Sequence, residues 1–457
     1  MDVKKVIDEE KIFSILEITK NPSPERVQEV LDKASKKDGL DLEEVAVLLN
    51  TNDPELIEKM FEVSGKIKDD IYGERLVFFA PLYLSSYCVN DCDYCGFHVR
   101  NEAPRRRLSL QEVREQTKIL TNMGHKRLLL EFGEHPIQSP IEYVVEVIKT
   151  IYDTKLKNGE IRRANVNIAA TTVENYRKLK EVGIGTYQLF QETYHRDTYE
   201  KLHKGPKADY ERQLFAHDRA MEAGVDDVGI GVLFGLFDYR FDVLGLVSHS
   251  EYLEREYNVG PHTISVPRFQ PGEGIDIDLP YKVSEDELLK IISILRMAVP
   301  YTGMIITTRE RPEIRAKSFK IGISQSSAAS RTTPGGYSEE KNLEQFSLQD
   351  HRGMDEILVS VLDQDLLPSY CTACYRLGRT GKKIMKLIKA GEIHNLCRPN
   401  AILTFNEYLE DYASDLVKEK SKRVVEKYLS EIKDPKVREE TKKRIESIKK
   451  GDRDLYF

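Results

Sequence analysis

The sequence predicts an α/β protein built on a complete parallel (βα)8 barrel of the triosephosphate isomerase type, with a helical extension before it and a mainly helical domain after it. Three observations support this fold class. Eight β-rich runs alternate with amphipathic stretches over about 250 residues, only helix signals precede them, and the β pattern ends after Gly335-Gly336. An open doubly wound sheet is the alternative for the same alternation. We expect three parts, at residues 1–72, 73–341 and 342–457.

The first 72 residues contain several helix starts and no strand pattern. Ser23 before Pro24 places a capping hydroxyl ahead of a proline in the first turn, Asp41 precedes LEEVAVLL, and Asp53-Pro54 precedes another amphipathic run. We therefore expect a helical N-terminal extension.

The eight predicted strands are short runs rich in apolar and β-branched residues. Two of the stretches between them, 109–124 and 284–299, have a serine at the start and helical periodicity. The strands are expected at 76–83, 127–133, 165–170, 186–190, 228–235, 263–269, 304–309 and 321–326. From residue 342 the pattern is helix and loop, ending in a charged tail typical of solvated helices with i,i+4 ion pairs.

Composition and charge exclude several classes of protein. Of 457 residues, 69 are Lys or Arg and 76 are Asp or Glu, giving a net charge of −7 without a basic tail. The longest apolar run, Leu76 to Leu84, is about half the ~18 residues that a membrane span needs, and acidic residues occupy the start. We expect a cytoplasmic protein that binds neither membrane nor nucleic acid.

All six cysteines fall into two short-spaced groups, and such groups in a reducing compartment more often bind metal than form disulfides. The first, Cys88, Cys92 and Cys95, follows the first predicted strand, so it would lie at the C-terminal mouth of a barrel, where active sites are found. Three thiolates can bind three irons of a 4Fe-4S cube and leave the fourth iron open. The alternative is a zinc site completed by a distant histidine or by His98.

The first group resembles the CxxxCxΦC signature of the radical S-adenosylmethionine superfamily, with Tyr94 as the aromatic residue. The resemblance implies that S-adenosylmethionine chelates the open iron and is cleaved to an adenosyl radical. Gly133-Glu134 is similar to the family's GGE element, although Phe132 replaces the first glycine. Glu192 and Arg212 resemble the pair that holds the ribose and carboxylate of the cofactor.

The second group, Cys371, Cys374 and Cys397, permits either a second cube or a zinc site completed by His394. The two groups together resemble the HydG family, the tyrosine lyases of FeFe-hydrogenase maturation, from about residue 70 to the end, including SQSSAASRTTPGGY at 324–337. The related 2-iminoacetate synthases of thiamine synthesis share the barrel and lack the second group. A non-catalytic iron-sulfur or zinc protein is the third hypothesis.

The HydG resemblance implies a reaction at two sites. L-tyrosine is cleaved to p-cresol and dehydroglycine at the first cluster, and dehydroglycine gives CO and cyanide at the second 4Fe-4S cluster, which carries an additional iron and a free cysteine. The implied partners are an electron donor such as ferredoxin or flavodoxin and other hydrogenase maturases.

Three more residues receive roles from the same resemblance. His262, immediately before the sixth predicted strand, would bind the additional iron, with His125 as the competing candidate at that mouth. Arg309 and Ser326, at the ends of the last two strands, would anchor the tyrosine carboxylate, because a guanidinium and a hydroxyl both donate to it.

Overall fold

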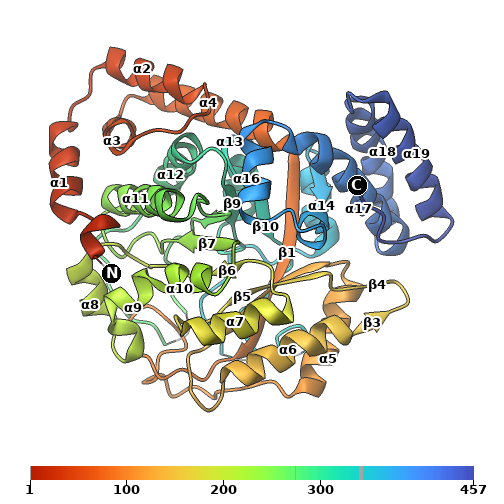
Figure 1. The fold of residues 1–457 in the computed structure, drawn as a ribbon, viewed down its shortest axis with the longest axis horizontal. Coiled ribbons are helices and arrows are strands. Elements are labelled where there is room, and N and C mark those ends of the chain that lie inside the picture. Colours follow the sequence, from red (N-terminus) through yellow and green to blue (C-terminus); the bar gives the residue numbers. More distant parts are fainter. Residues whose placement is uncertain (1, 273, 339–342) are drawn as a thin grey trace.

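The computed structural model describes residues 2–272, 274–338 and 343–457 (Figure 1). Its centre is a closed parallel barrel in which neighbouring strands pair in the order β1, β2, β5, β6, β7, β8, β9, β10, and β10 pairs with β1 again. The closure excludes the open doubly wound sheet. The barrel strands are β1 (Arg75–Ser85), β2 (Arg127–Phe132), β5 (Arg163–Asn167), β6 (Tyr187–Gln188), β7 (Val228–Gly231), β8 (Thr263–Ser265), β9 (Gly303–Ile306) and β10 (Gln325–Ser327).

All eight predicted strands have a counterpart here, and most are shorter than expected. The eighth also begins later, because α13 (Pro312–Ile321) continues into the residues assigned to it. The apolar Ile321 and Ile323 that suggested a strand start are both buried, so their apolar character reflects core packing outside the strand.

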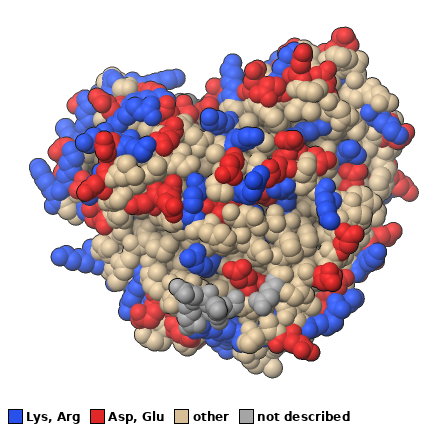
Figure 2. Space-filling model, turned by 180° about the vertical axis from the view of Figure 1, so that it is seen from behind, with Lys and Arg blue, Asp and Glu red and all other residues tan. Residues whose placement is uncertain are grey.

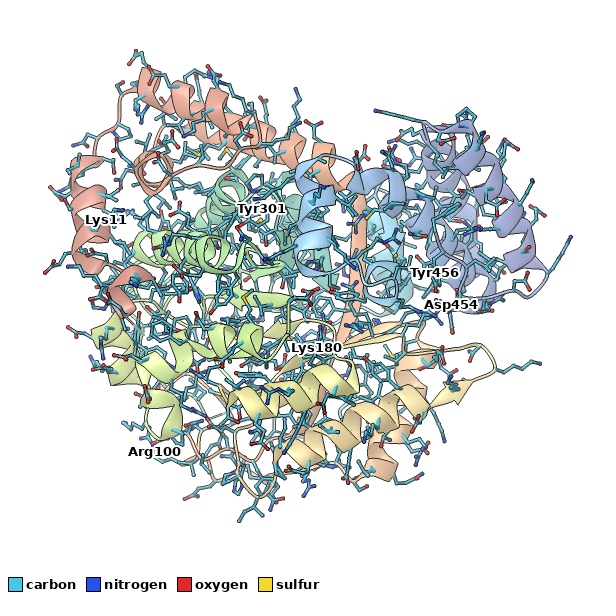
Figure 3. The ribbon with its side chains drawn as sticks, in the orientation of Figure 1. Lys11, Arg100, Lys180, Tyr301, Asp454 and Tyr456 are labelled. Carbon is cyan, nitrogen blue, oxygen red and sulfur yellow. The ribbon has the colours of Figure 1, made fainter. Side chains whose placement is uncertain are left out.

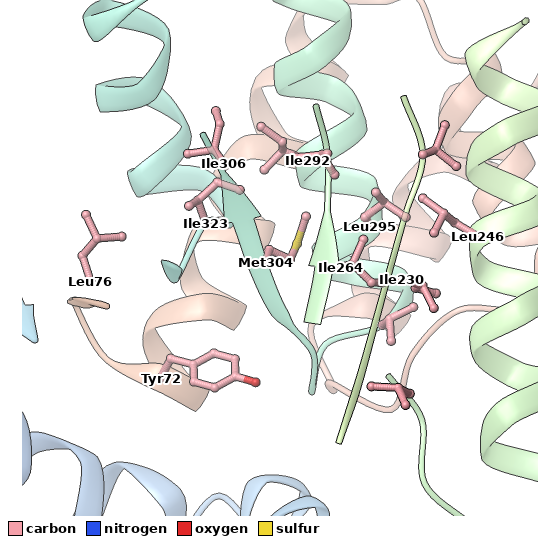
Figure 4. Close-up of a cluster of buried hydrophobic side chains, with 14 of the residues drawn as sticks. Tyr72, Leu76, Ile230, Leu246, Ile264, Ile292, Leu295, Met304, Ile306 and Ile323 are labelled. Atoms are coloured by element: carbon pink, nitrogen blue, oxygen red, sulfur yellow. The ribbon is translucent and has the colours of Figure 1, made fainter. Parts of the chain in front are cut away.

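The outer face of the barrel is covered by helices, whose packing follows from strand alternation. Figure 4 shows Ile230, Ile264 and Met304 from adjacent strands beside Leu246, Ile292 and Leu295 of the surrounding helices, all fully buried. The helices between the strands are α5 (Leu110–Asn122), α6 (Ile141–Asp153), α7 (Val173–Val182), α8 (Arg196–Leu202), η2 (Pro206–Ala208), α9 (Tyr210–Leu214), α10 (Ala216–Glu222), α11 (Tyr239–Tyr257) and α12 (Glu285–Ala298).

The helix starts predicted for this region have the expected capping groups. Ser109 at α5 and Ser284 at α12 both form capping boxes, in which the serine accepts from a backbone N–H and a glutamate accepts from the serine N–H. A small hairpin, β3 (Lys155–Leu156) and β4 (Gly159–Glu160), lies outside the barrel and was not predicted.

The N-terminal extension is helical, as predicted. It contains η1 (Val3–Lys5), α1 (Glu9–Ile18), α2 (Pro24–Ala34), α3 (Leu42–Asn50) and α4 (Pro54–Tyr72). Ser23, Asp41 and Asp53 each accept a hydrogen bond from the first turn of the helix that follows. The longest of these helices, α4, contacts α12 and α13, so the extension lies along one side of the barrel (Figure 1).

The C-terminal region is mainly helical but contributes a ninth strand to the sheet. β11 (Leu367–Ser369) pairs in parallel with the first residues of β1, from Arg75 to Val77. The helices are α14 (Met354–Leu362), α15 (Ala373–Arg376), α16 (Gly381–Lys389), α17 (Ile393–Asp411), α18 (Asp415–Ser430) and α19 (Pro435–Lys449). The predicted boundary between residues 341 and 342 lies outside the described residues.

Charges of both signs intermingle on the face shown in Figure 2. Among the helices of the described residues, none is long and apolar enough to cross a membrane.

Candidate functional site

The first cysteine group lies in the loop after β1, at the C-terminal end of the barrel. Arg100, from the same loop, marks this end at the lower edge of Figure 3, whereas Tyr301, just before β9, lies on the upper half. Two side-chain amides contact the cysteine sulfurs. Asn90 Nδ2 is 3.7 Å from Cys88 Sγ, and Gln345 Nε2 is 3.7 Å from Cys95 Sγ.

These cysteines suit a cationic metal group. Burial raises the pKa of both Cys92 and Cys95, so their thiolates need nearby positive charge to form. Among the described residues, we find no group of three or more His, Cys, Asp or Glu side chains arranged to bind a single metal ion. In a 4Fe-4S cube each cysteine binds a different iron, so the three sulfurs need not meet at one point.

Gly133 holds the cysteine loop close to the end of β2. A Cβ atom at this position would lie 2.2 Å from the carbonyl oxygen of Tyr87 and 3.3 Å from Cys88 Cβ. The absence of a side chain at Gly133 is therefore what allows the loop to pack there. Its predicted role toward the cofactor itself stays a prediction.

The four other residues predicted to bind the cofactor lie around the same loop but line two cavities, one with Glu134 and Arg212 and the other with Tyr94 and Glu192. Glu134 and Arg212 pair across 2.6 Å in an outer cleft of about 720 Å³, which is large enough for a small-molecule ligand. Glu192 faces the inner cavity instead and pairs with Lys207 across 2.6 Å. Glu192 and Arg212 thus line different cavities and each has its own ion-pair partner, and their roles toward the ribose and carboxylate of the cofactor stay predictions.

Tyr94 and Lys207 complete the surroundings of the first group. The Tyr94 hydroxyl lies 2.7 Å from Nε2 of the buried His203. Lys207 lies in the short η2 segment, and its positive charge lowers the pKa of Cys92 against the effect of burial. Nothing in the sequence around Lys207 indicated this position.

Arg309 lines the inner cavity, at the end of the barrel that carries the first cysteine group. Its guanidinium lies 3.3 Å from the centre of the Phe346 ring, and its side chain forms no hydrogen bond or ion pair within the described residues. Burial lowers the pKa of Arg309, and the acidic groups around it oppose that shift. Phe79, Leu129 and Ile305 form the apolar floor of the cavity.

The prediction that Ser326 faces this cavity is wrong. Its hydroxyl accepts from Arg315 Nη2 at 2.8 Å and donates to the Ile306 carbonyl at 3.1 Å, on the outer side of the barrel. Ser327 lines the cavity instead. Successive residues of a strand point to opposite faces, so an assignment shifted by one residue selects the wrong serine.

The second cysteine group lines a separate cavity at the N-terminal end of the barrel. Cys371 follows β11, Cys374 lies in α15 and Cys397 in α17, and all three line the cavity with His262. Burial and the neighbouring Cys397 thiol raise the pKa of Cys374 to about 12. This chemistry also fits a metal group that keeps thiolates deprotonated.

His262 is placed as the prediction requires, although its role is untested. Neither ring nitrogen of His262 forms a hydrogen bond with the described residues, and Nδ1 lies 3.8 Å from Asp227 Oδ1. The competing candidate, His125, is completely buried and does not line the cavity. The side chain of His394, the fourth ligand in the zinc alternative, lies outside the described part of the structure.

Arg75 is a further residue of this cavity that the sequence did not reveal. Burial opposes its charge, but the thiolates of Cys397 and Cys371 raise the pKa of Arg75 overall. Its side chain forms no hydrogen bond or ion pair with the described residues. The guanidinium of Arg75, the first residue of β1, is thus available to bind an anion beside the second cysteine group.

The two cavities are one layer of side chains apart inside the barrel. On each of four strands, residues two positions apart line different cavities. The N-terminal cavity contains Val77, Arg127, Gly303 and Gln325, and the C-terminal cavity contains Phe79, Leu129, Ile305 and Ser327. The barrel interior is therefore divided into two neighbouring chambers, each beside one cysteine group.

Comparison with known proteins gives two family matches and several close relatives. Residues 82–242 match the radical SAM superfamily, and residues 265–366 match the biotin and thiamin synthesis associated domain, which ends before Cys371. The chain is 29% identical to the 2-iminoacetate synthase of Escherichia coli K12 over 357 residues, 78% of this chain and 93% of that protein.

Two solved structures match almost the whole length of the chain. One is a crystal structure of HydG described as a maturase of the FeFe-hydrogenase. It has 55% identity, a TM-score of 0.97, and coverage of 99% of this chain and 100% of that chain. The other is the maturase HydG from Carboxydothermus hydrogenoformans, with 39% identity, a TM-score of 0.82, and coverage of 96% and 97%.

Proposed function

Because the chain belongs to the HydG family of radical SAM enzymes, we propose that it cleaves L-tyrosine to p-cresol and dehydroglycine and then converts dehydroglycine to CO and cyanide. These ligands would be captured on iron as a unit for the FeFe-hydrogenase H-cluster. The observation that carries this proposal is the pair of chambers one side-chain layer apart, each beside a cysteine group.

The C-terminal chamber suits the amino acid. Arg309 would bind the carboxylate, since a guanidinium donates two parallel hydrogen bonds to it. Ser327 would donate a third, because its oxygen already accepts from Thr308 N at 3.2 Å and its own proton is free. The aromatic ring would rest on the apolar floor, where contact with Phe79, Leu129 and Ile305 excludes water.

Cys88, Cys92 and Cys95 would hold a 4Fe-4S cluster, and Tyr94, Glu134, Glu192 and Arg212 would surround S-adenosylmethionine. When bound, the cluster and S-adenosylmethionine would supply adenosyl-radical chemistry for removing a hydrogen atom from the amino group of tyrosine. The amide donors Asn90 and Gln345 stabilise negative charge on the sulfurs of Cys88 and Cys95. Gly133 keeps that loop against the barrel.

The N-terminal chamber would hold the second 4Fe-4S cluster on Cys371, Cys374 and Cys397. His262 would bind the additional iron together with a free cysteine, and the lack of any hydrogen bond from its ring to the described residues supports this role. Ferredoxin or flavodoxin would supply electrons, and other hydrogenase maturases would receive the product.

The deciding experiment separates the two chambers. We expect Cys374→Ala and Cys397→Ala to leave p-cresol formation within about twofold of the parent, because the first cysteine group is untouched, and to abolish CO. Cys92→Ala is the matched control and should abolish both products. Anaerobically reconstituted variants are assayed together for p-cresol, CO and iron, with about nine irons expected for the parent from two cubes and one additional ion.

Two outcomes would contradict the maturase proposal. One is CO formation at the parental rate by the Cys374 or Cys397 variants, and the other is zinc at the second group of the parent. Either would favour a 2-iminoacetate synthase, the activity of the Escherichia coli relative.

A further inference from the structure

Two oppositely charged side chains face the C-terminal chamber without a partner. Glu131, near the end of β2, and Arg309, after β9, both line it. Within the part of the chain that the structure describes, neither side chain forms a hydrogen bond or an ion pair. Polar groups enclosed in this way are normally satisfied, so an unsatisfied pair facing one cavity indicates a ligand.

The position of Glu131 follows from the register of the barrel. Its Cα pairs with those of Tyr83 on β1 and Asn167 on β5, and all three side chains line the chamber. This is the level above the apolar floor, because Leu129, two residues earlier on the same strand, belongs to the floor. Glu131 therefore faces the half of the chamber nearer to the first cysteine group.

The other polar groups of the chamber that can carry charge already have partners. Glu192 pairs with Lys207, the Tyr94 hydroxyl with His203, and the Tyr83 hydroxyl donates to Gln345 at 2.7 Å. A ligand with one positive and one negative group would thus find its two complementary charges in Glu131 and Arg309.

The electrostatics of Glu131 agree with a missing cation. Burial raises the pKa of its carboxyl to about 8, the nearby Arg309 guanidinium lowers it, and Glu192 raises it further. A cation bound against Glu131 would replace lost solvation and favour the ionised carboxylate.

We propose that Glu131 binds the α-ammonium group of the substrate while Arg309 binds its carboxylate, so that the chamber selects a free α-amino acid. This inference rests on the proposed tyrosine lyase function and adds the residue that recognises the amino group. Because Glu131 and Arg309 would hold two different substituents of the same Cα atom, the amino nitrogen would be held at the level of the first cysteine group.

The test compares ligands that lack one charge each. L-tyrosine has both groups, 3-(4-hydroxyphenyl)propanoate lacks the ammonium, and tyramine lacks the carboxylate. Binding of the three ligands is measured by calorimetry on the anaerobically reconstituted enzyme with S-adenosylmethionine, for the parent, Glu131→Gln and Arg309→Gln. Glu146→Gln, on the exposed face of α6, is the matched control.

We expect Glu131→Gln to weaken tyrosine binding about 10- to 100-fold and to leave propanoate binding within about twofold, because the lost contact is a charge-assisted hydrogen bond. Arg309→Gln should weaken both carboxylate ligands and leave tyramine unchanged. The glutamine is nearly the same shape as the glutamate, and Glu131→Asp, which retains the charge, should restore part of the preference for tyrosine.

The ratio of tyrosine affinity to propanoate affinity also separates this inference from the proposed function. A parent that makes p-cresol, together with a Glu131→Gln variant that keeps the parental ratio of tyrosine to propanoate affinity, would overturn the inference alone. A parent that neither binds nor cleaves tyrosine would overturn both.

Discussion

On β10 a shift of one position along the strand decides which serine faces the chamber. Ser326 and Ser327 are chemically identical, but Ser326 joins Arg315 and the Ile306 carbonyl outside the barrel, and Ser327 faces the chamber. The sequence locates a serine-rich strand end. Which serine points inward depends on register, which is set by pairing with β1 and β9.

The two serines give a matched pair of variants. We expect Ser327→Ala to weaken tyrosine binding about 10-fold, since it removes a donor to a charged group. Ser326→Ala should leave tyrosine affinity unchanged and lower the free energy of unfolding by about 1 kcal/mol, because a buried guanidinium loses an acceptor. Calorimetric binding and chemical unfolding on both variants check this, and a larger affinity loss for Ser326→Ala would restore the original assignment.

Other residue roles also come from the structure alone. Two amides, Asn90 and Gln345, contact sulfurs of the first cysteine group, and the charge of Lys207 lowers the pKa of Cys92. Arg75 interacts electrostatically with the second cysteine group. Asn90 lies inside the first cysteine motif, whose spacing does not mark it, and the other three residues lie in local sequence that carries no motif. Their roles arise because distant segments meet, as when Gln345 is brought to Tyr83 across the barrel mouth.

At the scale of elements, the contact between the cysteine loop and β2 depends on Gly133. The backbone N–H of Gly133 donates to the Ser85 carbonyl at 2.9 Å, so β2 and the loop after β1 are joined where the loop leaves the barrel. An added methyl group would overlap the Tyr87 carbonyl and force the loop away.

We accordingly expect Gly133→Ala to lose about four irons per chain, those of the first cube, while the second group still loads. The control is Gly353→Ala, where the backbone has φ of −71° and the nearest atom to an added Cβ is 3.8 Å away. Iron and sulfide content after anaerobic reconstitution measures the effect. Full loading of both groups in the Gly133 variant would show that the loop accommodates the methyl group.

The unpredicted strand β11 shows what local patterns miss. It is only three residues long and contains a proline, so neither alternation nor β propensity marks it in a helical context. It forms because the first residues of β1 extend beyond the pairing with β2, which begins at Ala80, and leave backbone groups to pair. This pairing fixes where Cys371 lies relative to the barrel.

At the scale of the whole molecule, several buried histidines make stability depend on pH. Burial lowers the pKa of His125 to about 3, of His203 to about 3 and of His217 to about 4. In the unfolded chain these imidazoles take up protons near pH 6.5. The folded state binds fewer protons below that pH, so stability is fully present above pH 6.5 and is lost as the pH falls towards 4.

His125 provides the sharpest test, because neither of its ring nitrogens has a hydrogen-bond partner among the residues that the structure describes. Between pH 7.5 and pH 5, the free energy of unfolding should fall by about 1 to 2 kcal/mol less in His125→Leu than in the parent. Unfolding of the reconstituted protein at both pH values measures this. The exposed His351→Asn is the control and should follow the parent. A parallel fall for His125→Leu and the parent would mean that His125 is protonated in the folded state.

The sequence by itself determined the fold class, the eight strands of the barrel, the helical extensions and both cysteine groups, because each is encoded in local periodicity, capping residues or ligand spacing. The tertiary structure alone decided which serine faces the chamber, that Glu192 pairs with Lys207 and Arg212 with Glu134, and that Glu131 and Arg309 line one chamber. These facts depend on strand register and on barrel closure. Closure brings residues more than a hundred positions apart to one cavity, and no local pattern records such a meeting.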